Sequence, residues 1–196
     1  MLLDISYKEM MGALAVLIAL IAYAIYGWQT ATGHTRPHPL SWLIFGILTG
    51  TGFLVQWNQG AGAGSWVMGF TAVICFVLAA MSIKRGERTF PWYEWAFLIA
   101  AGVVFIFYIW TKEPTASAVL ATAVDVLGYG PTVTKAWARP ATDSVTSFAL
   151  NSVKFVPSLF AMESVSIATC VYPSTLIVVN AAVAILLLWR RWQLSQ

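Results

Sequence analysis

Charged residues are scarce in this chain of 196 residues, since aspartate, glutamate, lysine and arginine make up only 10% of it. A soluble globular domain carries about 25% charged residues, so the composition excludes that class. Hydrophobic residues make up 59% of the chain, and its mean hydropathy is +0.75. We therefore predict a membrane protein with several spans and short loops, and without room for a separate soluble domain.

Cysteine and histidine are also rare. The two cysteines, Cys75 and Cys170, lie in apolar stretches, and the two histidines, His34 and His38, share one polar loop with no carboxylate close in sequence. This spacing is not typical of metal sites. The chain also lacks a phosphate-binding glycine loop, a Ser-His-Asp set and paired carboxylates at one depth. We predict no metal, no cofactor, no nucleic-acid partner and no enzymatic activity.

The beginning of the chain lacks the basic residues of a signal peptide. Before the first apolar run, Asp4 and Glu9 outnumber Lys8. Secretory signals need a positively charged start. The first apolar run is therefore predicted to be a retained membrane helix.

What the chain has in quantity is long apolar runs. About 20 apolar residues cross the ~30 Å hydrocarbon core, and backbone groups in lipid must bond internally, so each run is predicted to be helical. All ten tryptophans lie at or near a predicted helix end, where their rings favour the membrane interface. The predicted fold is all-α integral membrane, with seven transmembrane helices at about 10–28, 40–57, 64–83, 92–111, 114–135, 144–162 and 168–189.

Lysine and arginine gather on one side of the predicted membrane. Lys8 and Lys112 lie on the N-terminal side, and Lys154 lies inside a helix. Basic loops stay in the cytoplasm, so we predict an outside N-terminus and a cytoplasmic C-terminus, in a plasma or inner membrane. The basic residues on the predicted cytoplasmic side are Arg36, Lys84, Arg85, Arg88, Lys135, Arg139, Arg190 and Arg191.

The chain repeats itself at an offset of 103 residues. Tyr26-Gly27 and Arg36-Pro37 recur as Tyr129-Gly130 and Arg139-Pro140, and ten identities fall within the 33 positions from 13 to 45. This offset superimposes the first three predicted helices on the last three and leaves the fourth as a linker. We therefore predict two parallel three-helix repeats, 1–83 and 114–196, joined by a linker helix within 84–113.

A 3 + 1 + 3 arrangement with an outside N-terminus resembles the PQ-loop superfamily. That group is named for a Pro-Gln dipeptide, of which Trp28-Gln29 and Pro131-Thr132 each keep one half. It includes the SWEET sugar transporters, the lysosomal cystine and cationic amino-acid exporters, and the KDEL receptors. The compact loops and small size are typical of a prokaryotic member.

Ionisable residues deep in a membrane helix are costly and are candidates for function. Asp125 and Lys154 fall near the middle of the fifth and sixth helices, with Asn151 and Asn180 at a similar depth. We predict a midplane solute site built mainly by the last three helices, in which Asp125 and Lys154 pair in one state. The alternative is an ion pair that only holds helices together. Their counterparts in the first repeat are Ala22, Thr51, Leu48 and Val77.

Hinges and gates are predicted where proline and tyrosine interrupt the spans. Pro131 and Pro157 lie inside the fifth and sixth helices, as Pro173 does in the seventh, and proline permits a kink. The alternative role for the tyrosines is to anchor the helices at the membrane interface. The alternative to hinge motion is close packing of the helices. The candidate hinge or gate residues are Tyr26, Gln29, Tyr129, Pro131 and Pro157.

The leading functional prediction is a transporter that moves a small polar solute by alternating access between two three-helix bundles. Proton coupling through Asp125 is a further option. A non-transporting receptor or sorting protein of the same architecture is the alternative. A retinal protein also has seven helices, but its lysine lies in the last helix, whereas Lys154 lies in the sixth. A zwitterion, a sugar and a nucleoside fit the polar residues equally well.

Overall fold

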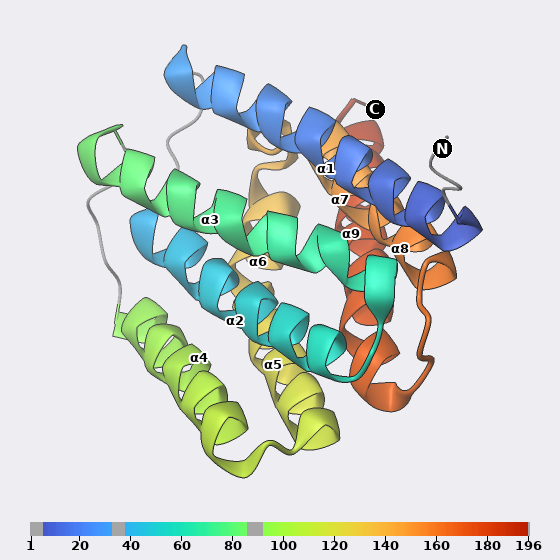
Figure 1. Ribbon diagram of the computed structural model, residues 1–196. Coiled ribbons are helices and arrows are strands. Elements are labelled where there is room, and N and C mark those ends of the chain that lie inside the picture. The colour runs from blue at the N-terminus through green and yellow to red at the C-terminus, as the bar shows by residue number, and fades with distance from the viewer. Residues whose placement is uncertain (1–5, 33–37, 86–91, 196) are drawn as a thin grey trace.

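The computed structural model describes residues 6–32, 38–85 and 92–195, and each of the seven predicted segments is helical in it (Figure 1). Asp4, His34, Arg36, Pro37 and Arg88 of the sequence analysis lie outside these residues. The elements are α1 (Tyr7–Ala31), α2 (Pro39–Asn58), the 3-10 helix η1 (Gly62–Ser65), α3 (Trp66–Arg85), α4 (Trp92–Thr111), α5 (Pro114–Gly128), α6 (Gly130–Ala138), the 3-10 helix η2 (Pro140–Thr142), α7 (Val145–Val153), α8 (Phe155–Phe160) and α9 (Ile167–Leu194).

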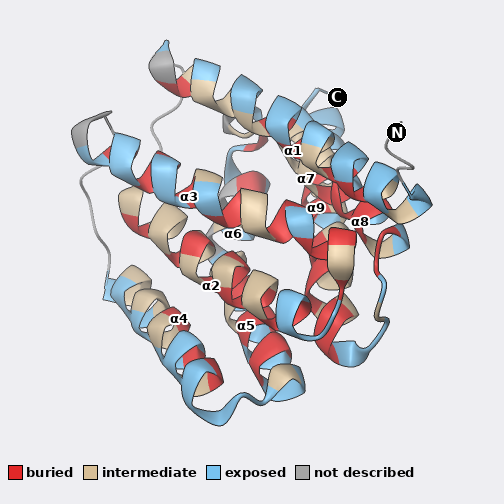
Figure 2. Cartoon of the chain, viewed as in Figure 1, coloured by how far each residue is buried: buried red, intermediate tan, exposed pale blue. Residues whose placement is uncertain are grey.

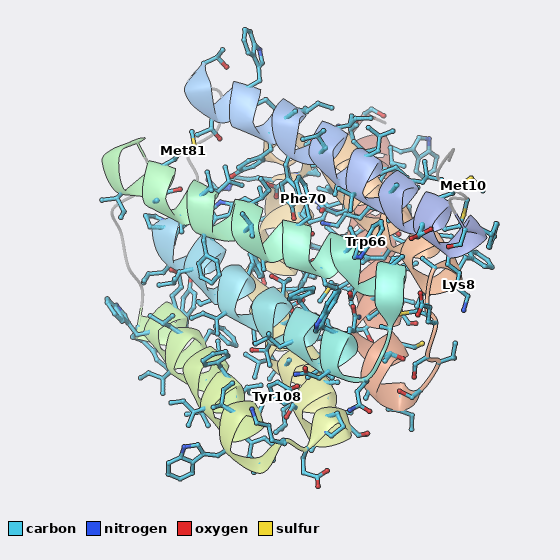
Figure 3. All side chains as sticks on the ribbon, viewed as in Figure 1. Lys8, Met10, Trp66, Phe70, Met81 and Tyr108 are labelled. Atoms are coloured by element: carbon cyan, nitrogen blue, oxygen red, sulfur yellow. The ribbon has the colours of Figure 1, made fainter. Side chains whose placement is uncertain are left out.

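The helices have the length and composition of membrane spans. Six stretches qualify in the described part of the chain: α1, α2, η1 with α3, α4, α5 with α6, and α9. The predicted segment 144–162 is split into α7 and α8, and each piece is too short to qualify by itself. Exposed positions cover the outside of the bundle (Figure 2), and many carry large apolar side chains, such as the labelled Met10 and Trp66 (Figure 3). Trp92, Trp110, Val73 and Val178 are exposed in the same way. An all-α integral membrane protein is therefore the class that the structure supports.

Local sequence explains where the helices start. Ser6 accepts a hydrogen bond from the backbone of Glu9, whose side chain accepts from the Ser6 backbone in turn, and this capping box begins α1. Ser166 and Thr169 form the same arrangement at α9. Proline occupies the first turn of α2 and of α5, where its missing N–H costs nothing.

Proline also explains where two helices break. A proline inside a helix cannot donate to the carbonyl four residues earlier. The fifth span breaks at Tyr129, just before Pro131, and the sixth breaks at Lys154, three residues before Pro157. α9 instead continues through Pro173. Two of the three prolines in the spans therefore interrupt their helix.

The helices pack in a regular order. α3 contacts both α1 and α2, and α9 contacts both the α5–α6 pair and the α7–α8 pair. α4 lies against α2 and α5, while α1 meets α7 and α8 across the bundle. Figure 1 shows α3 between α1 and α2. A core of buried apolar side chains joins these helices, including Leu48, Val67, Met68, Phe155 and Tyr172.

The bundle has two distinct ends. At the basic end, α1, α3, α6 and α9 finish, and Arg191 donates from α9 to the carbonyls of Pro140 (3.0 Å) and Asp143 (2.5 Å). At the opposite end, here called the η1 end, the short helix η1 contacts α1, α2, α3 and α8. The arginines Arg139, Arg190 and Arg191 thus mark one end, and small residues mark the other.

The η1 end is tightly packed. A Cβ added at Gly12 of α1 would lie 2.6 Å from the carbonyl oxygen of Ala63, and one added at Gly64 would lie 2.9 Å from the backbone of Met162. The Ser158 hydroxyl donates to the carbonyl of Gly64 at 2.8 Å. The backbone amide of Glu163 donates to the carbonyl of Ala61 at 3.1 Å. Glycine at these positions allows the backbones to touch.

Candidate binding site

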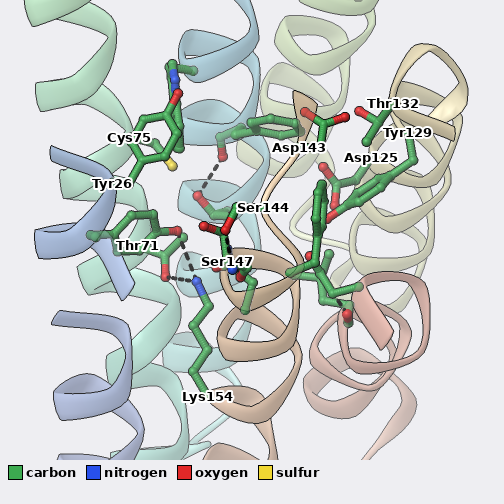
Figure 4. Close-up of a pocket in the computed structure, with 18 of the residues that line it drawn as sticks. Tyr26, Thr71, Cys75, Asp125, Tyr129, Thr132, Asp143, Ser144, Ser147 and Lys154 are labelled. Carbon is green, nitrogen blue, oxygen red and sulfur yellow. Dashed lines mark hydrogen bonds between the residues drawn. The ribbon is translucent and has the colours of Figure 1, made fainter. Parts of the chain in front are cut away.

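A cavity of about 680 Å³ lies between the helices at the basic end (Figure 4). It extends from Lys154 and Phe155, at the break of the sixth span, to Gln29, Ala141 and Asp143. Among the described residues, none from η1 or from the 161–166 connection lines it. Small-molecule sites commonly have volumes of about 300–1,000 Å³. The cavity is therefore large enough for a small solute and reaches only one end.

The structure brings the predicted site residues together. Asp125 from α5, Asn151 from α7, Asn180 from α9 and Lys154 from the α7–α8 break all line this cavity. Of the predicted gate residues, Tyr26, Gln29 and Tyr129 line it too. Pro131 and Pro157 mark the two breaks described above, and Pro157 is itself buried in α8.

Lys154 is turned toward the first half of the chain. It is 1% exposed, and its Nζ donates to the Tyr23 hydroxyl at 3.0 Å and to Thr71 Oγ1 at 3.2 Å (Figure 4). Nζ also lies 4.6 Å from the ring centroid of Tyr23 and 4.8 Å from that of Phe155. Such ring faces attract a cation. The break of the helix at Lys154 lets this side chain leave the line of α7 and reach α1 and α3.

Asp125 and Lys154 do not form the predicted pair in this conformation. Both side chains are described and buried, yet no ion pair joins them. Asp125 is 3% exposed, and its Oδ1 is buried without a hydrogen-bond partner in the part of the chain that the structure describes. The reason is geometric, because the hydroxyls of Tyr23 and Thr71 hold the ammonium group away from α5.

The two asparagines bind their own helices. Asn151 Nδ2 donates to the carbonyl of Ser147 at 3.0 Å, and Asn180 Nδ2 donates to that of Leu176 at 2.8 Å. An amide side chain has two N–H donors and a carbonyl oxygen. Each asparagine therefore has further hydrogen-bonding capacity beside the cavity.

The first half contributes more to the cavity than the sequence indicated. The sequence predicted a site built mainly by the last three helices, and Tyr23, Thr49, Thr71 and Cys75 of the first three helices also line the cavity. Threonine is an ordinary helix residue that often bonds its own backbone, as Thr49 does with the Phe45 carbonyl at 2.6 Å. No sequence signal separates such a threonine from Thr71, whose hydroxyl accepts from Lys154.

Trp42 also departs from the expected pattern. It lies near the start of α2, as an interfacial tryptophan should, but it lines the cavity. Its ring centroid lies 5.0 Å from that of Tyr26 and 6.3 Å from that of Tyr23. The cavity is therefore bounded in part by aromatic faces, including that of a tryptophan.

His38 has a carboxylate partner that the sequence did not indicate. His38 Nδ1 lies 2.8 Å from Glu94 Oε2, which joins the start of α2 to the first turn of α4 at the basic end. Within the described ranges, no three residues among histidine, cysteine, aspartate and glutamate gather as a metal site would require. The pair therefore connects two helices.

Comparison with protein-family models, with curated proteins and with solved structures finds no match to this chain. The features of the chain that bear on function are therefore its own: the cavity, the two buried ionisable side chains and the packed η1 end.

Proposed function

We propose that this protein is a membrane transporter that moves a small polar solute by alternating access between two three-helix bundles. One observation carries the proposal: the only two ionisable side chains predicted deep in the spans, Asp125 and Lys154, line the same cavity. Polar contacts between membrane helices contribute on average only about 0.6 kcal/mol. Helix adhesion alone is therefore a poor reason for keeping two buried charges.

The helix contacts support the two-bundle arrangement. α3 lies between α1 and α2 as α9 lies between the α5–α6 and α7–α8 pairs. Across the bundle, α1 contacts α7 and α8, and the equivalent pair under the 103-residue offset, α5 and α2, is also in contact. α4 would then be the linker. This exchange of partners is what two parallel repeats around one axis require.

Residues that match in the repeat also meet in the cavity. At the offset of 103 residues, three pairs line it from opposite halves: Tyr26 with Tyr129, Gln29 with Thr132, and Phe45 with Phe148. A cavity on the axis between two repeats would be lined in this way. These pairs support the PQ-loop-like architecture that the sequence resembles.

We infer the state of the transporter from the positive-inside rule. The basic end would face the cytoplasm, so the cavity would open inward while the η1 end closes the outside. The breaks at Tyr129 and Lys154 lie beside the cavity and would act as hinges. The outward state would open the η1 end.

A receptor or sorting protein of the same architecture is the second candidate. It is favoured by the one-sided cavity, since a receptor needs a pocket open to one side only, and η1 seals the other. The two functions differ in whether the η1 end ever opens.

Accessibility from each side tests this difference. Ser147 lines the cavity and is half-buried, so Ser147→Cys in a chain without Cys75 and Cys170 places one thiol there. A transporter in oriented proteoliposomes should react with a charged methanethiosulfonate from both sides, and more slowly from the outside. A receptor should react from one side only. Val178→Cys, on the exposed outer face of α9, is the matched control for reagent leakage.

Lys154→Met tests the role of the buried charge. Counterflow of labelled sugars, amino acids, nucleosides and vitamins should collapse at least tenfold in this variant, while its expression and melting temperature remain close to those of the parent. Unchanged transport with a lower melting temperature would instead identify Lys154 as a residue that only joins helices. No counterflow of any class by the parent would overturn the transporter proposal.

A further inference from the structure

Two buried charges of opposite sign face one cavity without neutralising each other. Asp125 comes from α5, while Lys154 points away from it toward α1 and α3 (Figure 4). A buried charge without an opposite partner is costly. The cavity therefore holds two side chains that a ligand can stabilise.

The bonds of Lys154 leave room for an anion. An ammonium group has three N–H donors, and two of them bind the neutral hydroxyls of Tyr23 and Thr71. The other close neighbours are the ring faces of Tyr23 and Phe155. A carboxylate would form a stronger, charge-assisted bond than either hydroxyl.

Within the described part of the chain, the carboxylate of Asp125 lacks hydrogen-bond donors and a positive charge beside it. Its Oδ1 accepts no hydrogen bond from any described residue, and Asp125 is only 3% exposed. A carboxylate accepts at about four positions. A ligand cation, which carries several N–H donors, would supply the missing bonds and the missing charge.

We propose that the solute is a small zwitterion, whose anionic group binds Lys154 in place of the Tyr23 and Thr71 hydroxyls and whose cationic group binds Asp125. The proposal rests on the transport function proposed above. A neutral sugar would leave both charges unpaired, an anion would leave Asp125 alone, and a cation would leave Lys154 alone. Only a ligand of both signs satisfies the two residues together.

The cavity walls leave space for an apolar side group. Phe45, Phe148 and Phe155 line the cavity together with Trp42. Its volume of about 680 Å³ exceeds what an ammonium and a carboxylate alone would fill. Side groups of different size are therefore compared in the test.

The test uses sets of molecules that differ only in charge. Glycine, L-leucine and L-phenylalanine carry both charges, their amides carry only the cation, their N-acetyl forms carry only the anion, and their N-acetyl amides carry neither. Binding to the purified full chain is measured as the rise in melting temperature, and transport is measured by counterflow. We expect at least one zwitterion to bind, and its three derivatives to bind at least tenfold more weakly.

Two variants assign the charges to the residues. Asp125→Asn should bind the N-acetyl form as well as the zwitterion, since the carboxylate that requires a cation is gone. Lys154→Gln should likewise bind the amide as well as the zwitterion. Thr122→Val, at a buried neutral position of α5 that is not among the described residues lining the cavity, is the matched control and should keep the preference for both charges. This exchange of preferences is not expected from a loss of stability.

The outcomes separate this inference from the proposed function. Equal binding of a zwitterion and its capped forms, or no binding of any zwitterion, overturns the zwitterion proposal. If a sugar or a nucleoside then shows counterflow, the transporter stands with another substrate. If no class shows counterflow, the transporter proposal falls as well.

Discussion

At the η1 end of the bundle, glycine and alanine let backbones touch, as Gly12 does with Ala63 and Gly64 does with Met162. At the basic end, aromatic and polar side chains surround a cavity of about 680 Å³. Both ends belong to the same apolar helices, so the average hydropathy does not distinguish them. The difference lies in side-chain size: small residues close one end, while Trp42, Phe148 and their neighbours hold the other apart.

Hydrogen bonding also differs between the two ends, although Gln56 Oε1 near the η1 end is buried without a partner among the described residues. At the η1 end, Ser158 and the amide of Glu163 bind backbone carbonyls across the helix contacts. In the cavity, a buried oxygen of Asp125 has no partner among the described residues. Close packing and hydrogen bonds at the η1 end hold the helices together. A buried polar group without a partner in the cavity favours the binding of a ligand. Each end can be changed independently of the other.

Locking the η1 end should produce the largest effect. A Cβ added at Gly12 would lie 2.9 Å from the Cβ of Ala63, and a disulfide needs about 3.5–4.5 Å between these atoms. Gly12→Cys with Ala63→Cys should therefore form a disulfide once α1 and η1 separate slightly, in a chain without Cys75 and Cys170. We expect oxidation to abolish counterflow and a reductant to restore it, because the proposed outward state would need this end to open. Each single-cysteine variant is the control. Full transport by the oxidised protein would contradict the assignment of this end as a gate.

The disulfide at the η1 end should affect transport and ligand binding differently. Since the cavity opens at the basic end, ligand binding by the oxidised protein should remain within about threefold of the reduced protein, measured by thermal shift. A parallel loss of binding and transport would mean that the two ends are not independent.

A second prediction compares one substitution at both ends of α1. Gly12→Ala should destabilise the protein by about 1–3 kcal/mol, the typical cost of overpacking, because the new methyl group meets the Ala63 carbonyl oxygen at 2.6 Å. Gly27→Ala meets no atom within 4 Å and should be neutral or stabilising by up to about 1 kcal/mol. Unfolding in detergent with increasing denaturant measures both. Equal effects would show that the η1 end is less tightly packed than described.

Much of the fold could be predicted from the sequence because membrane helices follow simple rules. Length, apolar composition and interfacial tryptophans placed each segment, and the helix starts at Ser6 and Ser166 follow from local capping. The breaks at Tyr129 and Lys154 follow from Pro131 and Pro157. Pro173 shows the limit of this rule, since α9 continues through it.

The candidate site could be predicted only in part. Asp125, Lys154, Asn151 and Asn180 were identifiable because deep polar side chains are rare in membrane helices. Thr71 was not, because its role depends on where the side chain of Lys154 turns. That direction is decided by contacts between helices far apart in the chain. Sequence position gives the depth of a residue but not its partner.

The smallest predicted effect concerns the rim of the cavity at the basic end. Arg191 donates through two different nitrogens to the carbonyls of Pro140 and Asp143, and a lysine at this position cannot reproduce that fork. Arg191→Lys should therefore lower stability by less than about 1 kcal/mol and speed hydrogen exchange of the η2 amides. Arg190→Lys is the control, because the contacts of Arg190 across helices are both to Trp137 of α6, a hydrogen bond to its carbonyl and a cation–π contact with its ring, and neither involves η2. Unchanged exchange in η2 would mean that the rim is held by its own backbone, and that the basic end does not need this arginine to keep its shape.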